Sequence, residues 1–104
     1  MARMEFGYHP PSGDRGIEII REREYLSDFQ KAMDVAAQSF QSVWISDHLA
    51  YADEFRLECW THLTWLAARY PGPKLGTIVM CNSWRQPSLM AKMASSLQYL
   101  SGVG

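Results

Sequence analysis

The sequence predicts an α/β fold in which parallel β-strands alternate with helices along a single 104-residue domain. Short runs of strand-type apolar residues alternate three times with segments whose apolar residues recur every three or four positions. The links from helix to strand are short, whereas the links from strand to helix are long. Because all the long loops leave the carboxyl ends of the strands, that side of the sheet is expected to carry the function.

The first unit is expected to contain a strand at residues 4–8, a polar segment as far as about Glu24, and a helix. Ser27 and Gln30 have the spacing of a capping box near the start of this helix, although a start one turn earlier also fits. The apolar face of the helix is expected to consist of Leu26, Phe29, Met33, Ala36, Ala37 and Phe40.

The second and third units repeat this pattern. A strand at residues 43–46 precedes a helix that the proline pair in Pro71–Pro73 ends, because proline cannot continue the hydrogen-bond ladder. A strand at residues 75–79 precedes a helix with Pro87 at its first position and Gly102 as its C-terminal cap. The buried side of this last helix is expected to consist of Met90, Met93, Ala94, Leu97 and Leu100.

Composition limits the possible functions. The chain is 47% hydrophobic and 20% charged, as in ordinary globular domains, and its formal charge of -1 provides no basic surface for nucleic acid. No apolar run approaches the roughly 20 residues that cross a bilayer, and the N-terminus lacks the apolar segment of a signal peptide. Cys59 and Cys81 form no CxxC motif and are expected to be free thiols in a reducing cytoplasmic environment. His9, His48 and His62 lack the spacing of metal ligands.

An acid and an imidazole follow the second strand directly. The run from Val43 to Ser46 ends in Asp47 and His48, at the kind of position where α/β folds gather their chemistry. This placement makes both residues candidates for a functional site. The alternative interpretation is that they are two polar residues at the start of a loop.

Three βα units are too few for a finished domain. A three-stranded parallel sheet leaves two unpaired edges, and closed βα barrels need eight units and typically about 250 residues. The sequence stops at Ser101–Gly104, where a turn is expected to lead to the next strand. We therefore expect the chain to be part of a longer fold.

Several motifs occur in a characteristic order and spacing. They are Phe6-Gly7, Phe40–His48, Glu58–Thr61, Leu66–Arg69, Leu75–Val79, Arg85–Pro87, Ala91–Ala94 and Leu100–Gly102. Together they resemble the luciferase-like flavin monooxygenase family, which includes deazaflavin-dependent oxidoreductases. The family usually continues after Ser-Gly with Gly-Arg and a fourth, glycine-rich strand, and Val103-Gly104 departs from this pattern.

The resemblance implies a (β/α)8 TIM barrel, of which residues 1–104 would be a partial domain comprising the first three βα units. It also implies a cofactor, either FMN or a deazaflavin (coenzyme F-420), bound at the C-terminal ends of the strands. His48 matches the family histidine that faces the flavin ring, and imidazole suits that place because it can change protonation near neutral pH. The alternative for His48 is a structural histidine.

Three further cofactor contacts follow from the resemblance. Ile78 and Val79 match a bulge with a non-proline cis peptide behind the ring, and Cys81 matches a position whose side chain approaches the ring. For Ile78 and Val79, the alternative is a regular buried strand. For Cys81, the alternative is a plain buried cysteine. Asp47 is expected either to orient the loop or the imidazole of His48, or to cap the following segment.

The leading functional prediction is an oxidoreductase or monooxygenase that acts on a small organic substrate, closer to the deazaflavin branch than to the FMN branch. The alternative is a non-catalytic barrel fragment or small interaction domain that associates through its exposed sheet edges. Under both the leading prediction and the alternative, we expect a homo-oligomer, and we expect neither nucleic acid nor a membrane as a partner.

Overall fold

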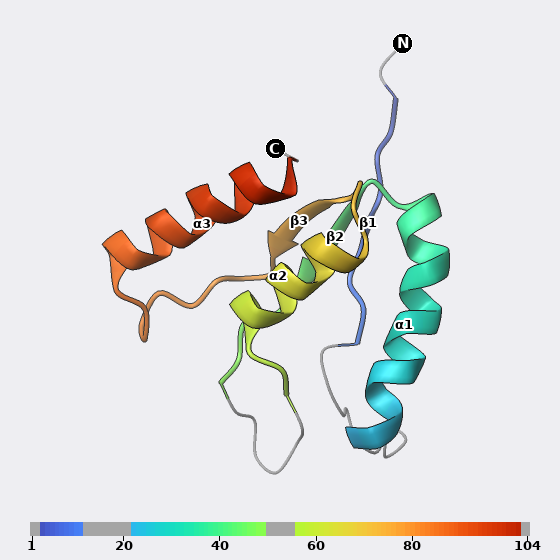
Figure 1. Ribbon diagram of the computed structural model, residues 1–104, viewed down its shortest axis with the longest axis horizontal. Helices are drawn as coiled ribbons and strands as arrows, with labels where there is room; N and C mark the ends of the chain where they lie inside the picture. Colours follow the sequence, from blue (N-terminus) through green and yellow to red (C-terminus); the bar gives the residue numbers. More distant parts are fainter. Residues whose placement is uncertain (1–2, 12–21, 50–55, 103–104) are drawn as a thin grey trace.

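The computed structural model describes residues 3–11, 22–49 and 56–102. Strands and helices alternate along the chain, as predicted (Figure 1). The elements are β1 (Gly7–Tyr8), α1 (Glu22–Ser39), β2 (Ser42–Ile45), α2 (Cys59–Arg69), β3 (Lys74–Thr77) and α3 (Pro87–Ser101). None of the helices in these ranges has the length and apolar character needed to cross a membrane.

The three strands form one parallel sheet in the order β1-β2-β3. Ser42 of β2 pairs with Gly7 of β1 and with Lys74 of β3, so the three strands are in direct register. The predicted fold class is therefore confirmed: this is the arrangement of successive βα units in a (β/α)8 barrel. Within the part of the chain that the structure describes, the outer edges of β1 and β3 pair with no further strand.

The core lies between the sheet and α1 and α2. Val43 and Ile45 of β2 are buried on the side of the sheet that faces the helices. They pack in one cluster with residues of α1 and α2, including Met33 and Leu66. α1 begins at Glu22, about a turn before the predicted capping box, and Leu26 from its expected apolar face is about half exposed.

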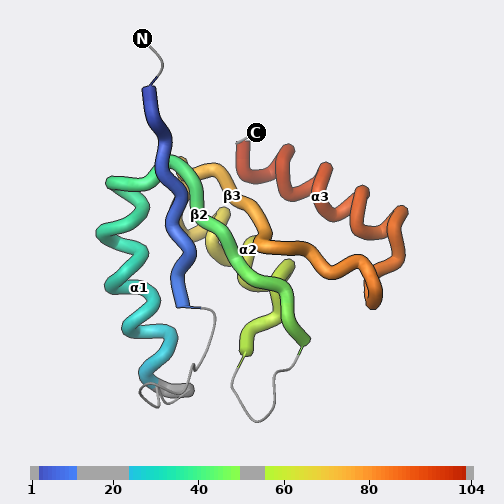
Figure 2. The backbone as a smooth tube through the Cα atoms, turned by 180° about the vertical axis from the view of Figure 1, so that it is seen from behind, coloured from blue at the N-terminus to red at the C-terminus, as the bar shows by residue number. Residues whose placement is uncertain are grey.

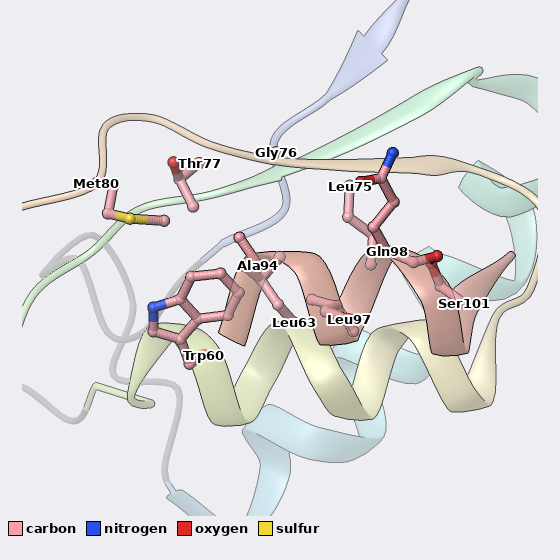
Figure 3. Close-up of a pocket in the computed structure, with 10 residues that line it drawn as sticks. All are labelled: Trp60, Leu63, Leu75, Gly76, Thr77, Met80, Ala94, Leu97, Gln98 and Ser101. Atoms are coloured by element: carbon pink, nitrogen blue, oxygen red, sulfur yellow. The ribbon is translucent and has the colours of Figure 1, made fainter. Parts of the chain in front are cut away.

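α3 is less buried than its pattern predicted. None of its residues is fully buried: Met90, Met93 and Leu97 are only half-buried, and Leu100 is exposed. α3 contacts α2, but a cavity of about 360 Å³ lies between α3, α2 and β3, with Leu75, Trp60 and Leu97 among its lining residues, so the packing of α3 is incomplete (Figure 3). Of the predicted face, Met90, Met93 and Leu97 pack against the core cluster, whereas Ala94 and Leu100 are exposed, so the predicted burial of this side is confirmed only in part.

The predicted ends of α3 are confirmed. Pro87 is in the first turn, where its missing N–H costs no hydrogen bond, and the side chain of Gln86 caps the helix by accepting from the Leu89 N–H. Gly102 ends the helix with φ of 69°, a left-handed conformation that glycine adopts without a Cβ clash.

The helices cover only one face of the sheet, and Figure 2 shows the strands from the other side. On this open face the indole of Trp44 lies across the sheet and donates from Nε1 to Ser42 Oγ at 2.8 Å. A Cβ atom at Gly7 or at Gly76 would lie 2.5 Å from this indole, so both neighbouring strands need glycine where the indole lies across them. Trp44 is 37% exposed because only the flat sheet lies against it.

Candidate functional site

The carboxylate of Asp47 joins the C-terminal ends of β2 and β3. Its side chain is only 1% exposed. Oδ2 accepts from the backbone N–H of Cys81 at 2.9 Å and from Nε of Arg85 at 3.0 Å, and Oδ1 accepts from Nη2 of Arg85 at 2.6 Å. The guanidinium therefore binds the carboxylate through two parallel hydrogen bonds, the strongest geometry for this pair. Asp47 thereby holds the loop after β3 through Cys81 and Arg85.

Glu58 extends this network to the start of α2. Its Oε2 lies 3.5 Å from Nη2 of Arg85, and its carboxylate caps the helix by accepting from the backbone N–H groups of Trp60 and Thr61. Burial raises the pKa of Glu58, but the hydrogen bonds from Thr61, Trp60 and Arg85 outweigh it, so its pKa lies below the ordinary value. The network of Asp47, Arg85 and Glu58 thus fixes the segments after β2, before α2 and after β3.

Sequence reasoning did not identify Arg85 and Glu58 as members of the site. Both occurred only within motifs of the family resemblance. A chemical argument could have identified them. Asp47 lies where a parallel strand ends, and an anion buried there needs a cation from a neighbouring loop. Arg85 is a cation in the next loop at the same end of the sheet, and Glu58 stands where the N-cap of the second helix is expected.

The predicted cofactor contacts lie at this same end of the sheet. His48 follows Asp47 directly and is half-buried. Ile78 and Val79 come directly after β3 and are 48% and 76% exposed, and the N–H of Ile78 donates to the Ile45 carbonyl at 2.9 Å. The Ile78–Val79 peptide bond is cis, as the resemblance implied.

The two cysteines have different surroundings. Cys81 is half-buried beside the site, and its N–H is held by Asp47. Cys59 is buried at the start of α2, and burial raises its thiol pKa to about 12, which leaves it protonated and unreactive at neutral pH. Both are free thiols, as predicted. Of the two, Cys81 is the one that lies at the C-terminal ends of β2 and β3, next to Asp47.

Taken together, the ends of β2 and β3 offer an imidazole, two exposed branched apolar side chains and a loop fixed by a buried ion pair. The model of the luciferase-like monooxygenase family matches residues 6–102 of this sequence. The chain therefore belongs to the luciferase-like monooxygenase family, a family of flavin-type oxidoreductases. No curated protein matches the sequence.

The helix cap at Glu58 can be tested by itself. Replacing Glu58 with alanine is expected to lower the free energy of unfolding by about 1 kcal/mol, because two N–H groups at the start of α2 lose their acceptor. Urea unfolding followed by circular dichroism measures the change. Glu24→Ala, at an exposed position on α1, is the matched control and should change the unfolding free energy by less than about 0.5 kcal/mol. Equal effects of the two substitutions would contradict the capping role.

Proposed function

We propose that the C-terminal ends of β2 and β3 form one wall of a site for a flavin-type cofactor, with a deazaflavin such as coenzyme F-420 preferred to FMN. The observation that supports this most strongly is the bond from the Cys81 N–H to Asp47, because it holds the Ile78–Cys81 segment beside the loop that carries His48. The substrate is a small organic molecule that meets the cofactor ring at the open side of this wall.

The residues fit such a cofactor in two respects. Ile78 and Val79 expose branched apolar surface at the strand end, and a planar ring system buries apolar surface of this kind. His48 supplies a group that donates hydrogen bonds in either protonation state, suited to negative charge on a reduced ring. Asp47 and Arg85 do not reach the ring in this proposal; they hold the backbone that presents Cys81.

When bound, a deazaflavin supplies hydride transfer with an organic substrate, whereas reduced FMN supplies oxygen activation. The protein's part is to orient the ring against Ile78 and Val79, to exclude water from its face, and to place the His48 imidazole where charge develops. The two free thiols are consistent with the proposed reducing, cytoplasmic setting.

The chain by itself is expected to bind the cofactor more weakly than micromolar as a monomer. Its strand ends form part of one wall, while a cofactor pocket normally encloses about 70–90% of its ligand. Fluorescence titration with coenzyme F-420 and with FMN measures the two affinities. Micromolar or tighter binding by a monomer would contradict the interpretation of these residues as one wall of a larger site.

Val79 and His48 are expected to affect different properties: Val79 the affinity for the cofactor, and His48 the reduction potential of the bound cofactor. Val79→Glu is expected to weaken cofactor binding by about tenfold or more, because it places a charge against the ring. His48→Ala is expected to change affinity less but to lower the reduction potential of the bound cofactor, because the reduced anion loses a donor. Spectroelectrochemical titration at saturating cofactor measures this potential. An unchanged potential in His48→Ala would remove His48 from the site.

A further inference from the structure

We propose that Trp44 is a further residue of the cofactor site, and that its indole forms the floor on which the inner end of the cofactor ring rests. The inference rests on the proposed function and deepens it, because it assigns which end of the cofactor enters the barrel. In a βα barrel the helices lie outside the strands, so the helix-free face across which the indole lies is the barrel interior (Figure 2).

Trp44 lies one side-chain layer below the proposed cofactor contacts. It pairs with Gly76 of β3, and Ile78 follows Gly76 by two residues. The Ile78 N–H donates to the Ile45 carbonyl at 2.9 Å, so the ladder continues to Ile78, and strand alternation places its side chain on the face that Trp44 occupies. Two residues along a strand rise about 7 Å, and a tricyclic flavin-type ring is longer than this. A ring that packs against Ile78 with its long axis along the strand therefore reaches the indole.

The indole spans three strands because both neighbours of β2 carry glycine beneath it. A Cβ atom at Gly7 would lie 2.5 Å from Nε1 at one end of the ring system, and a Cβ atom at Gly76 would lie 2.5 Å from Cε3 at the other end. The bond from Nε1 to Ser42 Oγ, of 2.8 Å, holds the ring in this orientation. One side chain thus covers the width of β1, β2 and β3 in this layer, and the floor is continuous across the wall.

The indole offers carbon surface rather than polar atoms to a ligand above it. Its N–H is already bonded to Ser42, at the N-terminal end of β2. The layer beneath is polar, because Lys74 begins β3 and forms an ion pair of 3.8 Å with Glu5. Trp44 therefore separates this polar layer from the C-terminal strand ends.

This surface fits one end of the cofactor and not the other. Aromatic rings pack favourably on a flat indole, whereas a phosphate finds no free donor there. We therefore expect the ring to enter the barrel first and the phosphate-bearing tail to stay at the mouth. FMN and coenzyme F-420 both carry a tricyclic ring and differ chiefly in their tails, so Trp44 should contribute about equally to the binding of either one.

Two-dimensional NMR of the labelled full chain is the first test. The indole N–H signal of Trp44, identified by its loss in Trp44→Phe, is followed during titration with coenzyme F-420 and with FMN. The expected result is that this signal shifts in parallel with the amide signals of Ile78 and Val79 for both cofactors. An unshifted indole signal while those amides shift would overturn the inference and leave the cofactor proposal standing. Unshifted signals at all three residues would overturn both.

Substitutions test the contribution of the aromatic ring to affinity. Trp44→Leu is expected to raise the dissociation constant for either cofactor about fivefold, because the cofactor ring loses its aromatic partner. Trp44→Phe keeps an aromatic ring and should recover part of the affinity. Tyr99→Leu, at an 87% exposed aromatic position on α3, is the matched control and should leave the dissociation constant unchanged.

Circular dichroism checks that each variant is folded. If Trp44→Leu does not fold, the indole signal of the original chain decides the question by itself. Equal dissociation constants for folded Trp44→Leu and for Tyr99→Leu would overturn the inference, because Trp44 would then only fill the barrel interior.

Discussion

Replacing Arg85 with alanine is expected to lower the free energy of unfolding by about 3–5 kcal/mol, the usual cost of removing one partner of a buried ion pair. The carboxylate of Asp47 is 1% exposed, and of the three hydrogen bonds that it receives from the described residues, two come from this guanidinium. Without Arg85 the charge stays buried, with the Cys81 N–H as its remaining donor among these three. Domains of this size are typically stable by only about 5–15 kcal/mol, so the loss is a large share of the total.

Urea unfolding measures the change. Arg85→Lys should recover only part of the stability, because an ammonium group cannot form the two parallel bonds to the carboxylate. Arg69→Ala, at an exposed position in the last turn of α2, is the matched control and should change the free energy by less than about 0.5 kcal/mol. A loss of less than about 1 kcal/mol in Arg85→Ala would show that the Asp47–Arg85 pair contributes no more than a surface ion pair.

His62 is expected to make the protein acid-sensitive. The imidazole is buried in α2, with its ring 4.8 Å from that of Phe29 and 6.5 Å from that of Trp65. Within the described part of the chain, neither ring nitrogen has a hydrogen-bond partner. Burial lowers the pKa of His62 from 6.5 to about 4, because the charged form is poorly solvated there.

The sign of the effect follows from the two pKa values. Between pH 6.5 and about 4 the unfolded chain binds a proton at His62 that the folded chain excludes, so stability falls as the pH falls through this window. The loss approaches about 3 kcal/mol at the lower end, at about 1.4 kcal/mol per pH unit. Unfolding free energies measured at several pH values should show this slope in the original chain. His62→Leu should remove it, and His9→Leu, at an exposed position, should retain it.

One outcome would contradict the assignment of the acid sensitivity to His62. If His62→Leu keeps the full slope between pH 6.5 and 5, the acid sensitivity belongs to other groups. The lowered pKa of Glu58 also makes stability fall in acid, but mainly below its ordinary value of 4.5. The two contributions therefore separate on the pH axis, and the upper part of the window reports on His62.

The alternation of strands and helices was predictable from sequence because each element buries one face against a shared core. The period-two burial of Val43 and Ile45 and the spacing of Phe29, Met33 and Ala36 on α1 reflect that core. Element ends were predicted less well. β1 was expected at residues 4–8, but its pairing begins at Gly7 because its partner strand begins at Ser42. The residue pattern of one strand does not show where its partner strand begins, although the partner decides where pairing starts.

The candidate site was predicted only in part for a similar reason. Asp47 and His48 adjoin a strand end and are visible in one short run of sequence. Arg85 lies 38 residues from Asp47, and only the parallel sheet brings the two together. The incomplete burial of α3 was also not predictable from its sequence. An apolar stripe shows which face of a helix is suited to packing, but it does not show whether another element covers that face.

The proposal of a flavin-type site at the C-terminal strand ends is tested most directly by two-dimensional NMR of the labelled chain during titration with coenzyme F-420 and with FMN. This measurement detects weak binding and assigns it to residues. The expected result is that the amide signals of His48, Ile78, Val79 and Cys81 shift together and saturate at lower concentrations of coenzyme F-420 than of FMN. Unchanged signals at these residues at millimolar cofactor, or shifts confined to the cavity between β3 and α3, would contradict the proposal.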